Sequence, residues 1–125
     1  MKKLIFYRCQ ICGNIVIKLV DKGMPVFCCG QAMSEIQPNT TDAAVEKHCP
    51  VVEVSDGVAT VKVGEVAHPM TPEHFISHIV LQTNVKVQYC QLQPGQQPQA
   101  EFALTDGEQV LQAFSFCNLH GVWSN

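Results

Sequence analysis

The chain has 125 residues, which is enough for one ordinary domain, or for one domain with a small appendage. With 46% hydrophobic and 15% charged residues, it has the composition of a soluble globular protein with a core. The net charge of −3, without a run of lysine or arginine, argues against a nucleic-acid partner. No stretch approaches the ~20 apolar residues of a membrane span, so we expect no membrane segment.

The opening MKKLIFYRC is similar to the start of a signal peptide. Its apolar run contains only Leu4, Ile5 and Phe6 before Arg8 interrupts it, and this is too short for the apolar region of such a peptide. We therefore expect a cytoplasmic protein. In that reducing compartment the seven cysteines are expected to bind metal rather than form disulfides, and their odd number also fits poorly with a disulfide framework.

The first 36 residues contain two cysteine pairs. Residues 14–27 between the pairs predict a strand, a turn at residues 21–23 and a second short strand. A piece this small cannot bury enough apolar surface to fold alone, so a bound metal is expected to hold it together. The expected ligands are Cys9, Cys12, Cys28 and Cys29.

The metal at this first cluster is either zinc or iron. A C-x-x-C pair places two sulfurs on one ion at about 2.3 Å each, and both metals accept this arrangement. Cys28 and Cys29 are adjacent, however, so they can share an ion only in a distorted tetrahedron. Structural zinc ribbons normally repeat C-x-x-C twice. The pattern alone does not separate the two metals.

Residues 37–44, QPNTTDAA, are polar and rich in turn formers, and we interpret them as a linker. After the linker the pattern is all-β. Residues 51–64 alternate around Ser55-Asp56-Gly57, residues 84–92 alternate as a strand, and residues 100–116 predict two more strands around Asp106-Gly107. Several short strands separated by turns indicate a sandwich or a barrel.

Residues 71–82, TPEHFISHIVLQ, fit two interpretations. Thr71 as N-cap and Pro72 at the first position would begin a helix. The β-branched content and the alternation that follows favour a strand.

The end of the chain, SFCNLHGVWSN, places Cys117 and His120 three residues apart. Two such ligands can bind one metal ion but cannot complete its shell, so other ligands are needed. Histidines in EKHCP and AHPMTPEHF lie at strand ends or in loops, where ligands from distant segments can converge.

The segments YRCQICG, CCGQAM, NTTDAAVEKHCPVVE, VKVGEVAHPMTPEHFI and FCNLHGVW together resemble desulfoferrodoxin, the two-iron class of superoxide reductase. The resemblance covers nearly the whole chain. It implies an all-β protein, with a desulforedoxin-like iron domain at 1–36 and an immunoglobulin-like β-sandwich at 45–125. The catalytic iron would have four equatorial histidines and one axial cysteine as ligands, namely His48, His68, His74, His120 and Cys117.

The resemblance implies a one-electron reduction of superoxide to hydrogen peroxide. Five protein ligands leave one octahedral position for the substrate, and a thiolate opposite that position pushes electron density toward iron. Lys47 would attract the superoxide anion, and Glu46 would bind the oxidised iron as sixth ligand. The four-cysteine iron would be an accessory electron-transfer site, a rubredoxin-like protein would donate electrons, and the chain would form a homodimer.

Three residues are left without a ligand role. On a strand, His78 would lie roughly 13 Å from His74, too far to share its metal. Cys49 and Cys90 match no functional position of the family, and Cys49 is interpreted as a small core residue. Two competing functions are a zinc-stabilised binding module and a pure electron carrier; the first conflicts with five donors at one site, and the second leaves the histidines unexplained.

Overall fold

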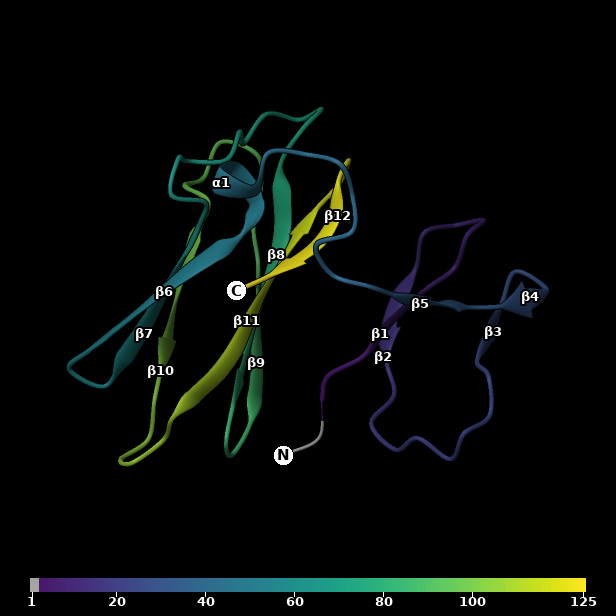
Figure 1. Cartoon of the computed structure of the whole chain (residues 1–125), viewed down its shortest axis with the longest axis horizontal. Coiled ribbons are helices and arrows are strands. Elements are labelled where there is room, and N and C mark those ends of the chain that lie inside the picture. The colour runs from purple at the N-terminus through teal and green to yellow at the C-terminus, as the bar shows by residue number, and fades with distance from the viewer. Residues whose placement is uncertain (1–2) are drawn as a thin grey trace. The chain divides into compact units, whose positions relative to one another are not determined.

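The structure is a computed structural model that describes residues 3–125. The chain divides into two compact units, Met1–Gln37 and Pro38–Asn125, which we call the cysteine unit and the sandwich unit (Figure 1). Almost all regular elements are strands, which confirms the all-β prediction. Among the described residues, no helix has both the length and the apolar character needed to cross a membrane.

The cysteine unit contains two small antiparallel sheets, of order β2-β1-β5 and β3-β4. Short strands form at both ends of residues 14–27, as predicted, but they do not pair with each other. Instead, each pairs with a strand next to a cysteine pair, so both sheets support the metal ligands. The strands are β1 (Phe6–Arg8), β2 (Ile15–Ile17), β3 (Phe27–Cys28), β4 (Gln31–Ala32) and β5 (Ser34–Ile36).

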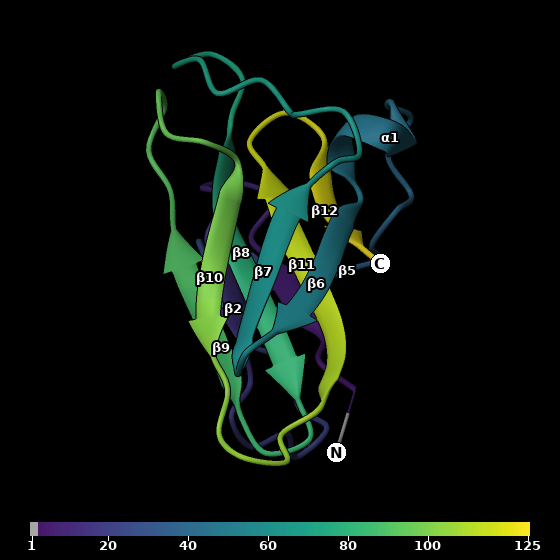
Figure 2. The same cartoon turned by 90° about the vertical axis from the view of Figure 1, so that its left-hand side faces the viewer.

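The sandwich unit packs a three-stranded sheet, β10-β7-β6, against a four-stranded sheet, β12-β11-β8-β9 (Figure 2). All pairings are antiparallel. The elements are α1 (Val45–His48), β6 (Pro50–Ser55), β7 (Val58–Val63), β8 (Ile76–Thr83), β9 (Val87–Gln91), β10 (Gln99–Ala103), β11 (Val110–Cys117) and β12 (Gly121–Ser124).

The hairpin of β6 and β7 forms where the sequence predicts it. Asp56 and Gly57 have φ angles of 52° and 74°, and this left-handed pair is what a tight two-residue hairpin turn requires. Side chains of β7 alternate, so that Ala59, Val61 and Val63 are buried. They pack against the other sheet in a core that includes Ile76, Ile79, Leu81, Phe102 and Ala113.

Residues 71–82 form a strand from Ile76 onward, so the strand interpretation is confirmed. The preceding part is not helical. Thr71 and His74 pair with each other in an isolated antiparallel bridge, which closes a tight loop. Downstream, β9 begins only at Val87, because the backbone N–H of Thr83 bonds to the carbonyl of Lys86 and turns the chain there.

The segment predicted as a linker, residues 37–44, is attached to a strand of the sandwich unit and is followed by a short helix. Asn39 donates its backbone N–H to the carbonyl of Val122 at 3.0 Å, and its side-chain Oδ1 accepts the N–H of Ser124 at 2.8 Å. These bonds attach the segment to β12. The single-turn helix α1 then follows, and the sequence pattern did not predict it.

Candidate metal centres

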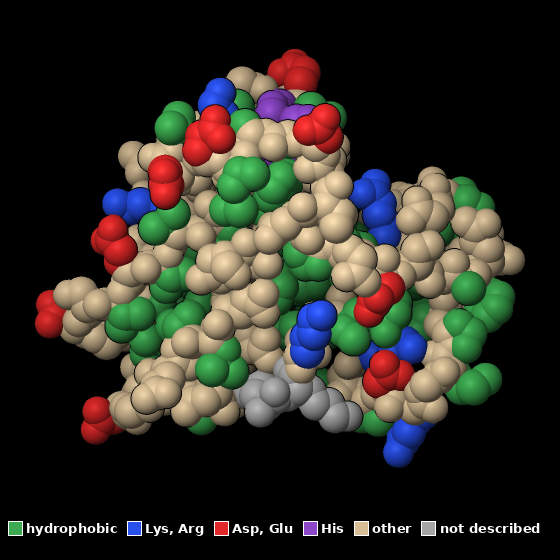
Figure 3. Space-filling view, in the orientation of Figure 1, with side chains coloured by type: hydrophobic (Ala, Val, Ile, Leu, Met, Phe, Trp, Pro, Cys, Tyr) green, Lys and Arg blue, Asp and Glu red, His purple; other side chains and the backbone are tan. Residues whose placement is uncertain are grey.

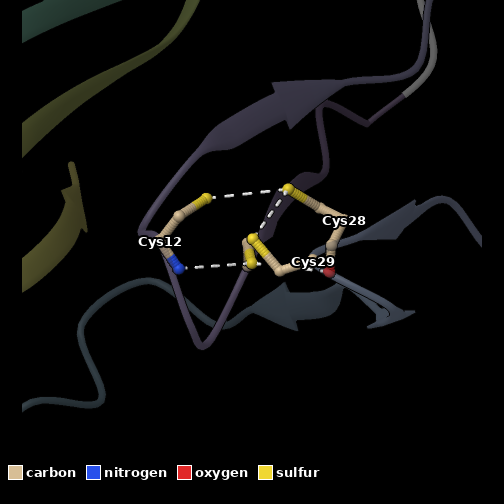
Figure 4. A group of neighbouring side chains, drawn as sticks. Cys12, Cys28 and Cys29 are labelled. Atoms are coloured by element: carbon tan, nitrogen blue, oxygen red, sulfur yellow. Dashed lines mark hydrogen bonds between the residues drawn. The ribbon is translucent and has the colours of Figure 1, made fainter.

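The cysteine unit brings together the four predicted sulfur ligands. The Sγ atoms of Cys9, Cys12, Cys28 and Cys29 all lie within 4.8 Å of one another. Figure 4 shows the sulfur of Cys12 facing that of Cys28 at 3.6 Å, with Cys29 beside Cys28 at 4.0 Å. A tetrahedral ion with metal–sulfur bonds of about 2.3 Å would place sulfurs ~3.8 Å apart, so the cluster has the dimensions of a single metal site.

Backbone conformation explains how adjacent cysteines share this site. Cys29 has a φ of 54°, and Gly30 follows with 78°. A left-handed residue is uncommon outside glycine, and here it turns the second sulfur back toward the first. On the other side, Gly13 donates its N–H to the carbonyl of Cys9 at 3.0 Å and closes the C-x-x-C turn.

Amide donors stabilise negative charge on the sulfurs. The N–H of Cys12 donates to Sγ of Cys9 at 3.4 Å, and Asn14 donates its backbone N–H to Cys12 and its side-chain amide to Cys28. The hydrogen bond from the backbone N–H of Cys12 lowers the pKa of Cys9 to about 6, whereas side-chain hydrogen bonding with Cys12, Cys9 and Cys28 raises the pKa of Cys29 to about 12. Several thiolates this close need a cation to share.

The sandwich unit gathers the second set of predicted ligands at one end. His48 is the last residue of α1, and Cys117 is the last residue of β11. His68 and His74 lie in the loop between β7 and β8, and His120 lies in the turn between β11 and β12. The antiparallel strands next to these four chain segments end at the same edge of the sandwich. The five predicted ligands therefore converge there.

The distances place four of these side chains around one point and the fifth, His68, beside them. Ligand atoms of His48, His74, Cys117 and His120 lie within 4.8 Å of one another. Nε2 of His48 lies 3.0 Å from Nδ1 of His120 and 3.1 Å from Nε2 of His68. The rings of His68 and His74 are 4.6 Å apart and almost perpendicular. The structure thus brings together all five residues.

Hydrogen bonding on the far side of the rings shows that a cation fits between them. Nδ1 of His48 lies 2.7 Å from the carbonyl of Ala44, and Nδ1 of His68 lies 2.7 Å from that of Pro69. A carbonyl only accepts, so both Nδ1 atoms carry the proton and both Nε2 atoms present lone pairs to each other. Nε2 of His74 is buried without a hydrogen-bond partner among residues 3–125. One metal ion satisfies all three nitrogens.

Burial keeps the imidazoles in the neutral form that binds metal. It lowers the pKa of His68 to about 4 and also lowers the pKa values of His48 and His74, with neighbouring charges, including that of Lys47, as smaller causes. Burial raises the pKa of Cys117, although backbone N–H groups of the following turn oppose the shift. A metal would remove that thiol proton on binding.

Two residues that orient these ligands were not predicted. The hydroxyl of Ser115, on β11, donates to the carbonyl of His48 at 2.7 Å. Asn118 accepts the N–H of Phe75 at 2.9 Å and donates to the carbonyl of Glu73 at 3.0 Å, so it joins the His74 loop to the Cys117 turn. Asn118 lies within the CNLH motif, but no spacing rule assigns a role to it.

The other predicted residues lie outside the ligand clusters. Glu46 and Lys47 are exposed on α1, directly before His48. His78 lies on β8 with its Nδ1 3.0 Å from the hydroxyl of Ser77, and its ring packs edge-on against Phe116. Cys49 and Cys90 are half-buried free thiols outside both groups.

Comparison with known proteins gives matches along the whole chain. The family model described as Desulfoferrodoxin matches residues 40–125, and the one described as Desulfoferrodoxin, N-terminal domain, matches residues 2–36. A desulfoferrodoxin of Syntrophotalea carbinolica is 46% identical, over 99% of this chain and 97% of its own length. A desulfoferrodoxin of Nitratidesulfovibrio vulgaris is 42% identical, over 94% of this chain and 91% of its own length.

Solved structures give the same result. A superoxide reductase from Treponema pallidum superposes with a TM-score of 0.84 at 43% identity and covers 99% of both chains. A superoxide reductase from Giardia intestinalis, described as a 1Fe enzyme, has a TM-score of 0.57 at 34% identity. It covers 64% of this chain and 95% of its own.

Proposed function

The chain belongs to the desulfoferrodoxin family, and we propose that it is a superoxide reductase with two iron sites. The carrying observation is a group of four donors within 4.8 Å of one another in the sandwich unit, with Nε2 of a fifth, His68, 3.1 Å from that of His48. A structural zinc site takes four ligands and is closed. Four imidazoles and one thiolate suit an iron ion with one position left for a substrate.

The proposed ligands of the catalytic iron are His48, His68, His74, His120 and Cys117. When bound, ferrous iron supplies one electron, and superoxide with two protons becomes hydrogen peroxide. The lone pairs of the histidines are directed inward by the carbonyls of Ala44 and Pro69. Since these imidazoles are neutral and only Cys117 is anionic, the ferrous site keeps a net positive charge that favours an anionic substrate.

The two residues before His48 are the proposed catalytic residues. The exposed ammonium group of Lys47 attracts superoxide to the site and holds it there by charge. Glu46 donates a carboxylate oxygen to the site in its oxidised state. Because both side chains lie on the same short helix as a ligand, their backbone is fixed relative to the metal.

The four-cysteine cluster is proposed to bind the second iron, as an accessory electron-transfer site. Its exposed cysteines, Cys12 and Cys29, give an electron carrier access to the metal. Zinc at this site would leave the reductase activity in place and make the cysteine unit purely structural. The seven free thiols accord with a reducing compartment, so we propose a cytoplasmic location.

A rubredoxin-like carrier is the proposed electron donor, and a homodimer is the proposed assembly. The cysteine unit exposes many large apolar side chains, such as Leu19 at 100%, Met24 at 71% and Phe27 at 65%. Apolar patches of this kind mark interfaces. A second copy of the chain is the proposed occupant, and sedimentation of the purified protein tests it.

The first experiment is to measure iron and zinc per chain on protein purified without added metal. Two irons support the full proposal, whereas one iron and one zinc retain the reductase and make the four-cysteine site structural. Zinc alone at both sites, after growth in iron-rich medium, would overturn the proposal. Cys117→Ser should then abolish superoxide reduction and leave the spectrum of the four-cysteine site unchanged.

A further inference from the structure

The only tryptophan of the chain, Trp123, lies against two of the five proposed iron ligands. We propose that Trp123 is a positioning residue of this site, whose indole fixes the rings of His48 and His120 and lowers the reduction potential of the bound iron. The inference rests on the proposed function, because it assumes a redox-active ion at the site. It specifies what a residue outside the ligand set contributes there.

The indole contacts both ligand residues directly. Its ring centroid lies 5.0 Å from that of His48, with 35° between the two ring planes, so the two rings are stacked with a tilt. Its Nε1–H donates to the carbonyl of His120 at 3.0 Å. The rings of His48 and His120 are themselves 5.0 Å apart, with 75° between their planes. One side chain therefore joins the last residue of α1 to the turn before β12.

The pairing of β11 with β12 directs the indole between the two sheets. Trp123 pairs with Ser115, so the two side chains point to the same face of the sheet. That face is the inner one, because Ala113 and Cys117, two residues before and after Ser115, belong to the core. The hydroxyl of Ser115 donates to the carbonyl of His48 at 2.7 Å. His48 is thus held through its backbone by β11 and across its ring by β12.

Burial separates Trp123 from the solvent side of the site. Histidine atoms reach the surface at the end of the sandwich unit that carries α1 (Figure 3), whereas Trp123 is only 2% exposed. Although it is buried, Trp123 is not a member of the main hydrophobic cluster that the described part of the sandwich unit forms. Its contacts with the ligand residues therefore come from inside the sandwich, and its role is to hold them rather than to bind superoxide.

The indole face also interacts with the charge of a bound metal. An aromatic face attracts a positive group within about 6 Å of its centroid, and tryptophan does so more strongly than phenylalanine. An imidazole bound to iron shares the positive charge of the metal, which is larger by one unit in the ferric state than in the ferrous state. The indole beside His48 therefore stabilises the ferric state more and lowers the reduction potential. A lower potential favours transfer of one electron from ferrous iron to superoxide.

Two substitutions in the full-length, iron-loaded protein test the inference. Trp123→Phe keeps an aromatic face but loses the N–H donor, and Trp123→Leu loses both. The affinity of the five-ligand site for ferrous iron, measured by competition with a chelator, should fall about 3- to 10-fold in Trp123→Phe and about 10- to 100-fold in Trp123→Leu. The reduction potential of this iron, measured by spectroelectrochemistry, should rise in both variants. In Trp123→Leu its one-electron equilibrium constant should change at least about threefold, and the potential of the four-cysteine site should not change.

The matched control is Phe102→Leu, which also removes a buried aromatic ring from the sandwich unit. Phe102 is 4% exposed, and it pairs with Ala59 near the start of β7, whereas the loop with two of the ligands follows the end of that strand. This variant should lower the free energy of unfolding of the metal-free protein, as Trp123→Leu does. Its iron affinity and reduction potential should stay unchanged, so a loss of stability alone does not produce the expected shifts.

A second measurement uses the indole itself and needs no superoxide. Because Trp123 is the only tryptophan, it accounts for the indole emission of the whole chain. Cobalt(II) added to the metal-free protein should quench most of this emission when it fills the five-ligand site. His74→Ala, which lacks one ligand, should lose most of the quenching, and the residual part comes from cobalt at the four cysteines. Zinc, which has no visible absorption, should quench far less.

Three results would overturn the inference. One is an unchanged iron affinity and potential in Trp123→Leu, or in Trp123→Phe if the leucine variant does not fold. Another is an equal change in Phe102→Leu, which would make Trp123 an ordinary core residue. The third is quenching by cobalt that His74→Ala does not reduce. Failure of the ferrous protein to consume superoxide, with iron bound as expected, would instead overturn the proposed function, so the two failures are distinguishable.

Discussion

Gly64 lies directly against the backbone of Glu46. A Cβ at position 64 would be 2.7 Å from the carbonyl oxygen of Glu46 and 2.7 Å from Cα of Lys47. Gly64 also has a φ of 86° and donates its N–H to the carbonyl of Cys49 at 3.0 Å. The absence of a side chain at Gly64 thus lets the β7–β8 loop approach the helix that carries the proposed catalytic residues.

We predict that Gly64→Ala displaces α1 and weakens the catalytic site. The free energy of unfolding should fall by about 2–4 kcal/mol, since a backbone clash adds to the cost of the left-handed conformation. Iron content of the sandwich unit and the rate of superoxide reduction should both fall. Metal analysis, thermal unfolding and pulse radiolysis measure these effects.

Gly95→Ala is the matched control for this prediction. Gly95 has a φ of 92°, but a Cβ there meets nothing within 4 Å. The free energy of unfolding of Gly95→Ala should fall by only about 1 kcal/mol, the cost of a left-handed backbone at a residue with a Cβ. This variant should retain its iron. Equal losses of stability and iron in the two variants would show that the close contact of residue 64 with α1 does not support the catalytic site.

Asn118 is predicted to determine metal affinity through His74. Asn118→Ala removes both hydrogen bonds to the His74 loop, and loss of such outer contacts typically lowers metal affinity about 10- to 100-fold. A chelator competition on the reduced protein measures this affinity. In Asn118→Asp, which keeps the acceptor for Phe75 but loses the donor to Glu73, the loss should be intermediate. Unchanged affinity in Asn118→Ala would remove the residue from this role.

Much of the fold could be predicted from local pattern. The Asp56-Gly57 turn and the alternation of β7 specify a hairpin, because only a left-handed pair closes a two-residue turn. In the cysteine unit the local pattern predicts where the strands form but not which strands pair. The strands near residues 15 and 27 form as predicted, but each pairs with a strand outside residues 14–27, and the local pattern does not specify those partners.

Local chemistry indicates the Cys117–His120 pair and further histidines in EKHCP and AHPMTPEHF, and the resemblance to a family assigns the complete set of five ligands. Ser115 and Asn118 were missed because their role depends on which strands end together, and no spacing along the chain encodes that. The helix α1 was missed as well. One turn has no periodic pattern, and the structure stabilises it through the contacts of His48.

His78 provides a negative test of the ligand set. It lies on β8, opposite Gln91, and its ring contacts Phe116 and the hydroxyl of Ser77 instead of the metal cluster. We predict that His78→Ala retains one iron in the sandwich unit and reduces superoxide at an unchanged rate. His74→Ala is the comparison, and it should lose the iron. Loss of this iron in both variants would mean that the ligand set is wrong.

Lys47→Ala should slow the association of superoxide and leave both iron sites occupied. The segments that carry the ligands also hold three exposed carboxylates, on Glu46, Glu65 and Glu73, so removal of this ammonium group leaves them with negative charge only. We expect a decrease of roughly tenfold at low salt, and Lys47→Arg should retain most of the rate. Pulse radiolysis at increasing ionic strength measures it. A rate constant that does not change at low salt would exclude Lys47 from the mechanism.

The metal-free protein should lose stability as the pH falls from about 6.5 to about 4. The pKa of His68 is lowered to about 4 by burial, so in this range the unfolded chain binds a proton that the folded protein excludes. Burial shifts the pKa values of His48, His74 and His78 in the same direction. Above pH 6.5 these imidazoles are neutral in both the folded and the unfolded state, so they do not make the free energy of unfolding depend on pH.

A second loss should follow below pH 4.5, where Glu108 is protonated in the unfolded chain. Its hydrogen bond from the hydroxyl of Thr83 lowers the pKa of Glu108 to about 2, so its contribution disappears as the pH falls toward that value. Chemical unfolding of the metal-free protein at a series of pH values separates the two ranges. His68→Gln should flatten only the upper range and Glu108→Gln only the lower one. If His68→Gln left the upper range unchanged, the buried, neutral state of that imidazole would be contradicted.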